Sequence, residues 1–214
     1  MTPARARALH LVVAVVAWGA VVLQLVLVLT GSAVLVEDDP PGMVERIYRF
    51  FAYFTIQSNL LVAIVSTVLA RDPLLDRPGW RVVRLAGVAG IAVTGVVHFF
   101  LLRPLLDLDG ADWVADKLLH MVVPVLALAV WAWVGPRPRM TGREVAYALM
   151  WPIAWLVWTL AVGQVDGWVP YPFLDPGEDG WGAVGVACVG ITVLFLAVFA
   201  LIHWLDRRLP PAPR

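Results

Sequence analysis

Two pairs of polar residues, each four positions apart within an apolar stretch, carry the side chains that hydroxyl-nucleophile chemistry requires. Thr55 and Asn59 would share one face of a helix. Asp116 and His120 would share a face of another helix in the same way. An imidazole is the usual base for a hydroxyl, and a neighbouring carboxylate can orient it. In this interpretation Thr55 is the nucleophile and His120 its base. Asn59 or a backbone N–H would stabilise the oxyanion, and Gln57, about 160° from Thr55 around the helix, is a further supporting residue.

The elements that must position these residues are membrane-spanning helices. Apolar residues make up 61% of the 214-residue chain, and the mean hydropathy is +0.81, whereas an average soluble domain is roughly 45–50% apolar. We therefore predict an all-α polytopic integral membrane protein, a single domain over 1–214, whose six spans each cross about 30 Å of hydrocarbon. The predicted spans are about 9–30, 48–70, 82–102, 115–135, 145–163 and 183–205.

The basic residues between the spans predict the orientation. Four of the sixteen fall on one side of the membrane, namely Arg46, Arg49, Arg103 and Lys117. The other twelve fall on the side of the termini: Arg5, Arg7, Arg71, Arg77, Arg81, Arg84, Arg137, Arg139, Arg143, Arg207, Arg208 and Arg214. By the positive-inside rule both termini are cytoplasmic.

The first stretch also has features of a secretory signal, because Arg5 and Arg7 precede it and the small residues Gly31-Ser32-Ala33 follow it. Its apolar run of about twenty residues exceeds the 7–15 of a usual signal core, which favours an uncleaved span.

This topology places the candidate residues at one depth. Counted along the helical rise from Arg49, Thr55 lies about 9 Å below the outer boundary. Counted from Arg103, His98 lies at about 7–8 Å, and counted from Lys117, His120 lies at about 5 Å. We therefore expect Thr55, His98 and His120 to meet near the outer surface, where the ester groups of lipids also lie. For His98, the roles of second base, orienting residue and structural residue all stay open.

Other residue patterns exclude several classes of function. A formal net charge of zero argues against a nucleic-acid partner. Cys188 is the only cysteine, so the chain forms neither an intramolecular disulfide nor a thiolate metal cluster. Taken alone, a Thr such as Thr55 within a span is more often a packing residue that bonds to the carbonyl one turn back.

Three motifs resemble those of a known family. They are Phe54-Thr55 in the second span, Asp116-Lys117-Leu118-Leu119-His120 followed by Pro124 in the fourth, and Tyr171-Pro172-Phe173-Leu174 in the last outer loop. Together they resemble the androgen-induced membrane-protein family, intramembrane threonine hydrolases of fatty-acid esters of hydroxy fatty acids, and especially its bacterial six-span branch.

The resemblance implies that Thr55 and His120 are the catalytic pair, that Tyr171 and Phe173 belong to the substrate pocket, and that the membrane is a bacterial plasma membrane. The animal members carry Asn or His at the positions of Asp116 and Lys117, so another lipid ester, or a pocket kept without the chemistry, is also compatible with it.

Three functions follow. The first is hydrolysis of lipid esters by Thr55 and His120 near the extracytoplasmic face, with membrane lipids as partners and no metal or other cofactor. The second is a b-type electron carrier, in which His98 with His120 and His10 with His203 form two bis-His haem sites. The third is a non-catalytic lipid-binding or transport protein, for which the sequence offers no inverted repeat.

Overall fold

Among the residues that the structure describes, six helices are long and apolar enough to cross a membrane, as the hydropathy predicts. The computed structural model describes residues 2–31, 41–137 and 139–209, and among these it contains helices and loops but no strands. The candidate spans are Pro3–Leu29, Phe54–Arg71, Pro78–Leu105, Gly110–Val134, Gly142–Asp166 and Gly180–Arg208. Most extend several residues beyond the predicted limits, because a helix continues past the apolar run that hydropathy detects.

The helices are α1 (Pro3–Leu29), α2 (Met43–Ala52), α3 (Phe54–Arg71), α4 (Pro78–Val97), α5 (Gly110–Lys117), α6 (Val123–Val134), α7 (Gly142–Asp166) and α8 (Pro176–Arg208). Two π-helical turns, η1 (His98–Leu102) and η3 (Leu118–Val122), continue α4 and join α5 to α6. Two short 3₁₀ turns are η2 (Arg103–Leu105) and η4 (Pro172–Leu174).

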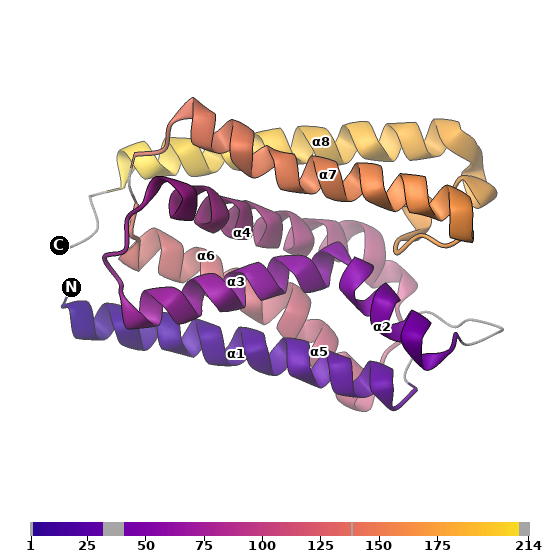
Figure 1. Cartoon of the computed structure of the whole chain (residues 1–214), viewed down its shortest axis with the longest axis horizontal. Helices are drawn as coiled ribbons and strands as arrows, with labels where there is room; N and C mark the ends of the chain where they lie inside the picture. Colours follow the sequence, from indigo (N-terminus) through magenta and orange to yellow (C-terminus); the bar gives the residue numbers. More distant parts are fainter. Residues whose placement is uncertain (1, 32–40, 138, 210–214) are drawn as a thin grey trace.

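The bundle has α1 on one face and the pair α7 and α8 on the opposite face, with α3 and α4 between them (Figure 1). One apolar core packs α1, α3 and α6 together, and a second packs α4, α7, α8 and the segment around Leu174. The start of α1 and the end of α8 lie at the same end of the bundle, called here the terminal end. The opposite end, called the α2 end, carries α2, both π turns and the start of α3.

Apolar side chains cover much of the outside of the bundle. Val15, Phe100, Val125 and Val157 are each more than 60% exposed. A soluble monomer rarely leaves such large apolar surfaces in water, whereas lipid tails cover them without cost. The exposed side chains therefore agree with an integral membrane protein.

The second predicted span, 48–70, is interrupted in the structure. Residues 48–52 belong to the separate helix α2, and the spanning helix α3 begins only at Phe54. Tyr53 joins them in an extended conformation, with φ −63° and ψ 126°. Thr55 is consequently the second residue of its helix, whereas the predicted span placed it about two turns inside.

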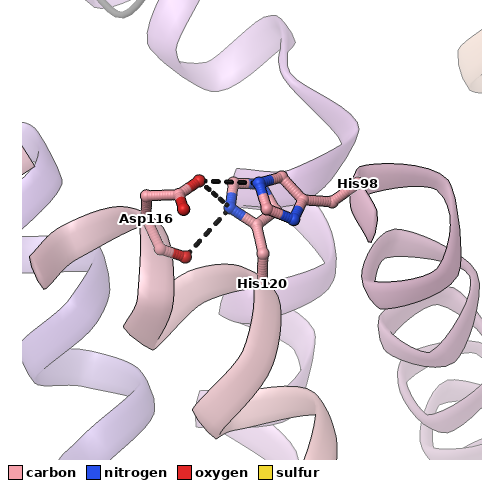
Figure 2. A group of neighbouring side chains, drawn as sticks. All are labelled: His98, Asp116 and His120. Atoms are coloured by element: carbon pink, nitrogen blue, oxygen red, sulfur yellow. Dashed lines mark hydrogen bonds and ion pairs between the residues drawn. The ribbon is translucent and has the colours of Figure 1, made fainter. Parts of the chain in front are cut away.

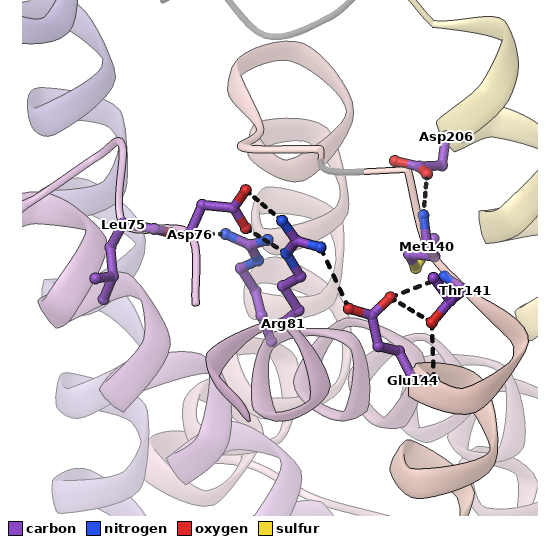
Figure 3. Close-up of polar contacts among 8 residues, drawn as sticks. Leu75, Asp76, Arg81, Met140, Thr141, Glu144 and Asp206 are labelled. Atoms are coloured by element: carbon purple, nitrogen blue, oxygen red, sulfur yellow. Dashed lines mark hydrogen bonds and ion pairs between the residues drawn. The ribbon is translucent and has the colours of Figure 1, made fainter. Parts of the chain in front are cut away.

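Polar contacts tie the loops together at the terminal end (Figure 3). Arg81 at the start of α4 pairs with Asp76 at 2.5 and 2.7 Å and lies 3.5 Å from Glu144. Glu144 in turn closes a capping box with Thr141 at the start of α7. The Arg81 guanidinium holds the pKa of Asp76 below its ordinary value. These contacts fix the loops that are farthest along the bundle from Thr55.

Candidate active site

The break at Tyr53 leaves backbone groups that side chains from elsewhere satisfy. The carbonyl of Ala52 accepts a hydrogen bond from Trp155 Nε1 at 2.8 Å, and that of Phe51 accepts one from Gln57 Nε2 at 3.0 Å. Gln57 Oε1 also accepts from Trp151 Nε1 at 3.1 Å. Gln57, predicted as a further supporting residue, therefore supports the helix break and bonds to α7 on the side away from Thr55.

Both histidines near Thr55 belong to π-helical turns. His98 begins η1 and His120 lies in the middle of η3. Each turn begins six residues before a proline, Pro104 and Pro124 respectively, which has no N–H to continue the helical ladder. Single π turns are rare and are frequent at functional sites, because they redirect side chains out of the regular helical spacing.

The structure brings Thr55, His120 and Asp116 together in one chain of contacts. Thr55 Oγ1 lies 3.3 Å from His120 Nε2. On the other side of the ring, His120 Nδ1 lies 2.9 Å from Asp116 Oδ1 and 3.1 Å from the backbone oxygen of Asp116. Thr55 and Asp116 are buried and His120 is nearly so. This confirms that the three residues predicted to cooperate lie within contact distance.

These contacts fix the tautomer of His120. Both groups near Nδ1 are acceptors, so the proton resides on Nδ1, where the backbone oxygen of Asp116 has hydrogen-bonding geometry. Nε2 therefore presents a lone pair to Thr55 Oγ1. A hydroxyl, an imidazole and a carboxylate in this order are the arrangement by which serine and threonine hydroxyls are activated.

The hydroxyl of Thr55 does not make the bond that a packing threonine makes. Its partners are His120 and Tyr171, from two other segments of the chain. By contrast, Thr67 Oγ1 donates to Ala63 O at 2.7 Å and Thr192 Oγ1 to Cys188 O at 2.7 Å, each one turn back. The environment of Thr55 thus differs from the packing interpretation of its sequence position.

His98 shares the carboxylate with His120 (Figure 2). Its Nε2 lies 2.8 Å from Asp116 Oδ1, and its ring stacks on that of His120 with centroids 3.9 Å apart and an interplanar angle of 8°. The other carboxylate oxygen, Oδ2, accepts a hydrogen bond from Lys117 Nζ at 2.7 Å. His98 and Lys117 therefore hold Asp116 and, by stacking, the plane of His120. Lys117 was not among the predicted supporting residues, although it directly follows Asp116.

Tyr171 lies closer to the candidate nucleophile than a pocket-lining role requires. Its hydroxyl is 3.2 Å from Thr55 Oγ1 and accepts a hydrogen bond from Thr55 N at 3.2 Å. Its ring packs against Tyr53, Trp155 and Phe173, the last of these stacked at 5.3 Å. Burial raises the pKa of Tyr171 above its ordinary value, so the phenol keeps its proton and remains a donor. The phenol therefore lies where it can donate to a charge that develops beside Thr55 Oγ1.

Asn59 has a structural role in place of the predicted oxyanion contact. Its Nδ2 donates to Thr55 O at 2.8 Å and to Leu119 O at 3.2 Å. In the π turn η3 the next donor for Leu119 O would be the nitrogen of Pro124, which carries no hydrogen. Asn59 therefore supplies the hydrogen bond that the proline lacks and joins α3 to the turn that carries His120.

Replacing Asn59 by leucine removes this bond and leaves a buried carbonyl without a donor. We expect the free energy of unfolding to fall by about 1–2 kcal/mol, the range for a buried bond between membrane helices. Chemical unfolding in detergent, compared with Thr67→Val on the same helix, measures the change. Equal stabilities of the wild type and Asn59→Leu would contradict this role.

A metal ion is an alternative for the cluster of His98, Asp116 and His120, because one ligand atom from each residue lies within 4.8 Å of the others. The lone pairs of an imidazole lie in its ring plane. The two ring planes here are nearly parallel, and the ring centroids are 3.9 Å apart. Two such lone pairs do not converge on one ion in the way that a tetrahedral site requires. The cluster fits acid–base chemistry better than metal ligation.

The stacking of His98 on His120 also disagrees with the haem site predicted for this pair. The two axial ligands of a haem face each other across the macrocycle and do not stack. The inner pair also lies apart, because α1 and α8, which carry His10 and His203, are on opposite faces of the bundle. His10 Nε2 lies instead 3.1 Å from Gly135 O.

No protein-family model, curated protein or solved structure matches this chain. Its function is therefore inferred from the geometry around Thr55.

Proposed function

We propose that the protein is an intramembrane hydrolase of lipid esters in which Thr55 is the nucleophile and His120 the general base. The observation that supports this proposal is the continuous line of contacts from Thr55 Oγ1 through both nitrogens of His120 to Asp116. The resemblance of its motifs to the androgen-induced membrane-protein family suggests fatty-acid esters of hydroxy fatty acids as the kind of substrate.

The reaction follows from the positions of the atoms. His120 Nε2 takes the hydroxyl proton of Thr55 while Oγ1 attacks the acyl carbonyl and forms a tetrahedral intermediate. The phenol of Tyr171, whose oxygen accepts a hydrogen bond from the N–H of Thr55, donates a hydrogen bond to the oxyanion and stabilises it. As the intermediate collapses, His120 returns the proton to the departing alkoxide, which leaves as the alcohol. His120 then takes a proton from water, the hydroxide attacks acyl-Thr55, and the carboxylic acid leaves as Thr55 Oγ1 recovers its proton.

The location of the site supports a substrate that arrives from the bilayer. The residues lie at the α2 end of the bundle, and the distribution of basic residues predicts that this end is on the outer side of the membrane and that both termini are inside. Lipid esters lie at a comparable depth. In this proposal water enters from the outer surface and the ester enters sideways.

The experiment that tests this function measures fatty-acid release by the purified protein in lipid vesicles, with a panel of lipid esters. The background control is the double variant Thr55→Ala/His120→Ala, matched for folding by its thermal transition. Release above that background supports the proposal. A folded wild type that releases no more acid than the double variant from any ester contradicts it.

Tyr171→Phe tests the oxyanion role, because it removes one hydroxyl and keeps the ring that packs against Trp155 and Phe173. We expect kcat to fall by about a hundredfold or more, as when one oxyanion donor is lost, with little change in the thermal transition. Steady-state kinetics on the best ester measures it. A change in kcat below threefold would show that Tyr171 only packs.

A further inference from the structure

Two cavities meet at Thr55. One, called the α2 cavity, has a volume of about 160 Å³ and extends from Thr55 and His120 towards Arg46 and Arg49 of α2. The other, called the α8 cavity, has a volume of about 210 Å³ and lies between α4, α7 and α8. Thr55, Leu102 and Tyr171 line both of them. An ester whose carbonyl is at Thr55 Oγ1 therefore has a separate space for each of its two parts.

The α8 cavity suits a hydrocarbon chain. Its walls are apolar residues such as Val93, Val97, Trp155, Ile191 and Phe195. Along α8 it extends from Cys188 to Leu196, a rise of about 12 Å at 1.5 Å per residue. It also carries no charged side chain among the described residues that line it, so a charged group placed there would be desolvated without a partner.

The α2 cavity differs in charge. Arg46 and Arg49 line it, and its described lining residues include no carboxylate. Arg49 pairs with Glu45, at 2.5 Å, and its guanidinium lies over Trp168. Arg46 is half-buried and donates from Nε to Pro41 O at 2.8 Å. A guanidinium so placed binds carboxylate or phosphate oxygens strongly, because its donors match their geometry.

We propose that the two cavities divide the substrate at the ester bond. The acyl chain occupies the α8 cavity, and the alcohol part, carrying a carboxylate or a phosphate, occupies the α2 cavity with its anionic group at Arg46. This inference rests on the proposed function and adds to it the direction in which the ester binds. It also makes the stretch of α8 from Cys188 to Leu196 the wall that contacts the acyl chain, and it places the leaving alcohol on the side of α2.

The acyl half of the proposal is tested with Ile191→Trp, which fills the α8 cavity. The matched control is Val193→Trp on the same helix, where the side chain is 59% exposed. With nitrophenyl esters of increasing acyl length, we expect Ile191→Trp to lower kcat/KM for long chains by roughly tenfold or more and to spare short ones. Cys188→Phe provides a second variant of the same cavity wall. Equal losses for all lengths in both cavity variants, or the same length profile in Val193→Trp, would overturn the assignment.

The alcohol half is tested with Arg46→Gln against Arg103→Gln, a basic residue that does not line the cavity. Three substrates share one acyl chain and carry a carboxylate, a phosphate or no charge on the alcohol part. We expect Arg46→Gln to lower kcat/KM about tenfold or more for the anionic esters, the contribution of one charge-assisted hydrogen bond. The neutral ester and Arg103→Gln should stay within threefold of wild type, and Arg46→Lys should restore part of the loss.

The two anionic esters show which group Arg46 binds. The ester whose kcat/KM falls more in Arg46→Gln carries that group, either the carboxylate or the phosphate. If the wild type hydrolyses the neutral ester as efficiently as both anionic ones, and Arg46→Gln affects all three equally, the division of the substrate is wrong while hydrolysis stands. If the folded wild type hydrolyses none of these esters, the proposed function itself fails.

Discussion

Thr55→Ala lowers ester hydrolysis by at least about a thousandfold, because it removes the atom that forms the acyl-enzyme and leaves the rest of the site in place. Only the hydroxyl and one methyl group are lost, and Ser58 and Asn59 continue to bond to the carbonyl of residue 55. Folding should therefore change little. The rate of fatty-acid release from the best ester, at saturating substrate, measures the effect.

Two further variants distinguish a nucleophile from a structural hydroxyl. Thr55→Ser keeps the hydroxyl beside His120 Nε2 and should retain a large part of kcat. Thr67→Ala removes a hydroxyl from the same helix, where it bonds to Ala63 O and accepts from Trp18, and should leave kcat unchanged. Hydrolysis by Thr55→Ala within tenfold of wild type would show that another group attacks the ester.

His120→Ala lowers kcat by about a hundredfold to ten-thousandfold, the usual contribution of a general base. His98→Phe is the natural comparison. Both imidazoles contact Asp116 Oδ1 and both are stacked on each other, but the contact to Thr55 Oγ1 comes from His120. A phenyl ring at position 98 keeps the stacking. We therefore expect the fold-decrease in kcat of His98→Phe to be less than a tenth of that of His120→Ala.

Added imidazole separates chemistry from packing in this comparison. His120→Ala opens a space beside Thr55 that free imidazole can enter, and it should regain activity as the imidazole concentration rises. A positioning residue such as His98 would not be rescued in this way. A larger loss in His98→Phe than in His120→Ala, at equal thermal stability, would reverse the assignment of the base.

The helices and the meeting of the candidate residues could be predicted from the sequence because simple periodicities govern them. Runs of apolar residues located six spans to within a few residues. Counting the helical rise from the charged ends predicted one depth for Thr55 and His120, although the count for Thr55 treated the helix as continuous across Tyr53, where it is broken. The four-residue spacing placed Asp116 beside His120. The apolar runs and the four-residue spacing both depend on local sequence alone.

The remaining features depend on contacts between distant residues. The break at Tyr53 contains neither Pro nor Gly, and what stabilises it is Trp155 and Gln57 donating to the freed carbonyls. The hydroxyl of Tyr171 reaches Thr55 across 116 residues of sequence. For Asn59 a signal did exist, since Pro124 four residues after His120 implied a carbonyl in need of a donor.

The most direct test of whether His120 activates Thr55 is to find the residue on which a covalent adduct forms. The purified wild type is treated with a fluorophosphonate, a reagent that labels activated hydroxyls, digested, and the modified residue identified by mass spectrometry. We predict an adduct on Thr55 that is absent from Thr55→Ala, strongly reduced in His120→Ala and unchanged in Thr67→Ala. A folded wild type without an adduct, or an adduct on another residue such as Ser58, would contradict the claim that His120 activates Thr55.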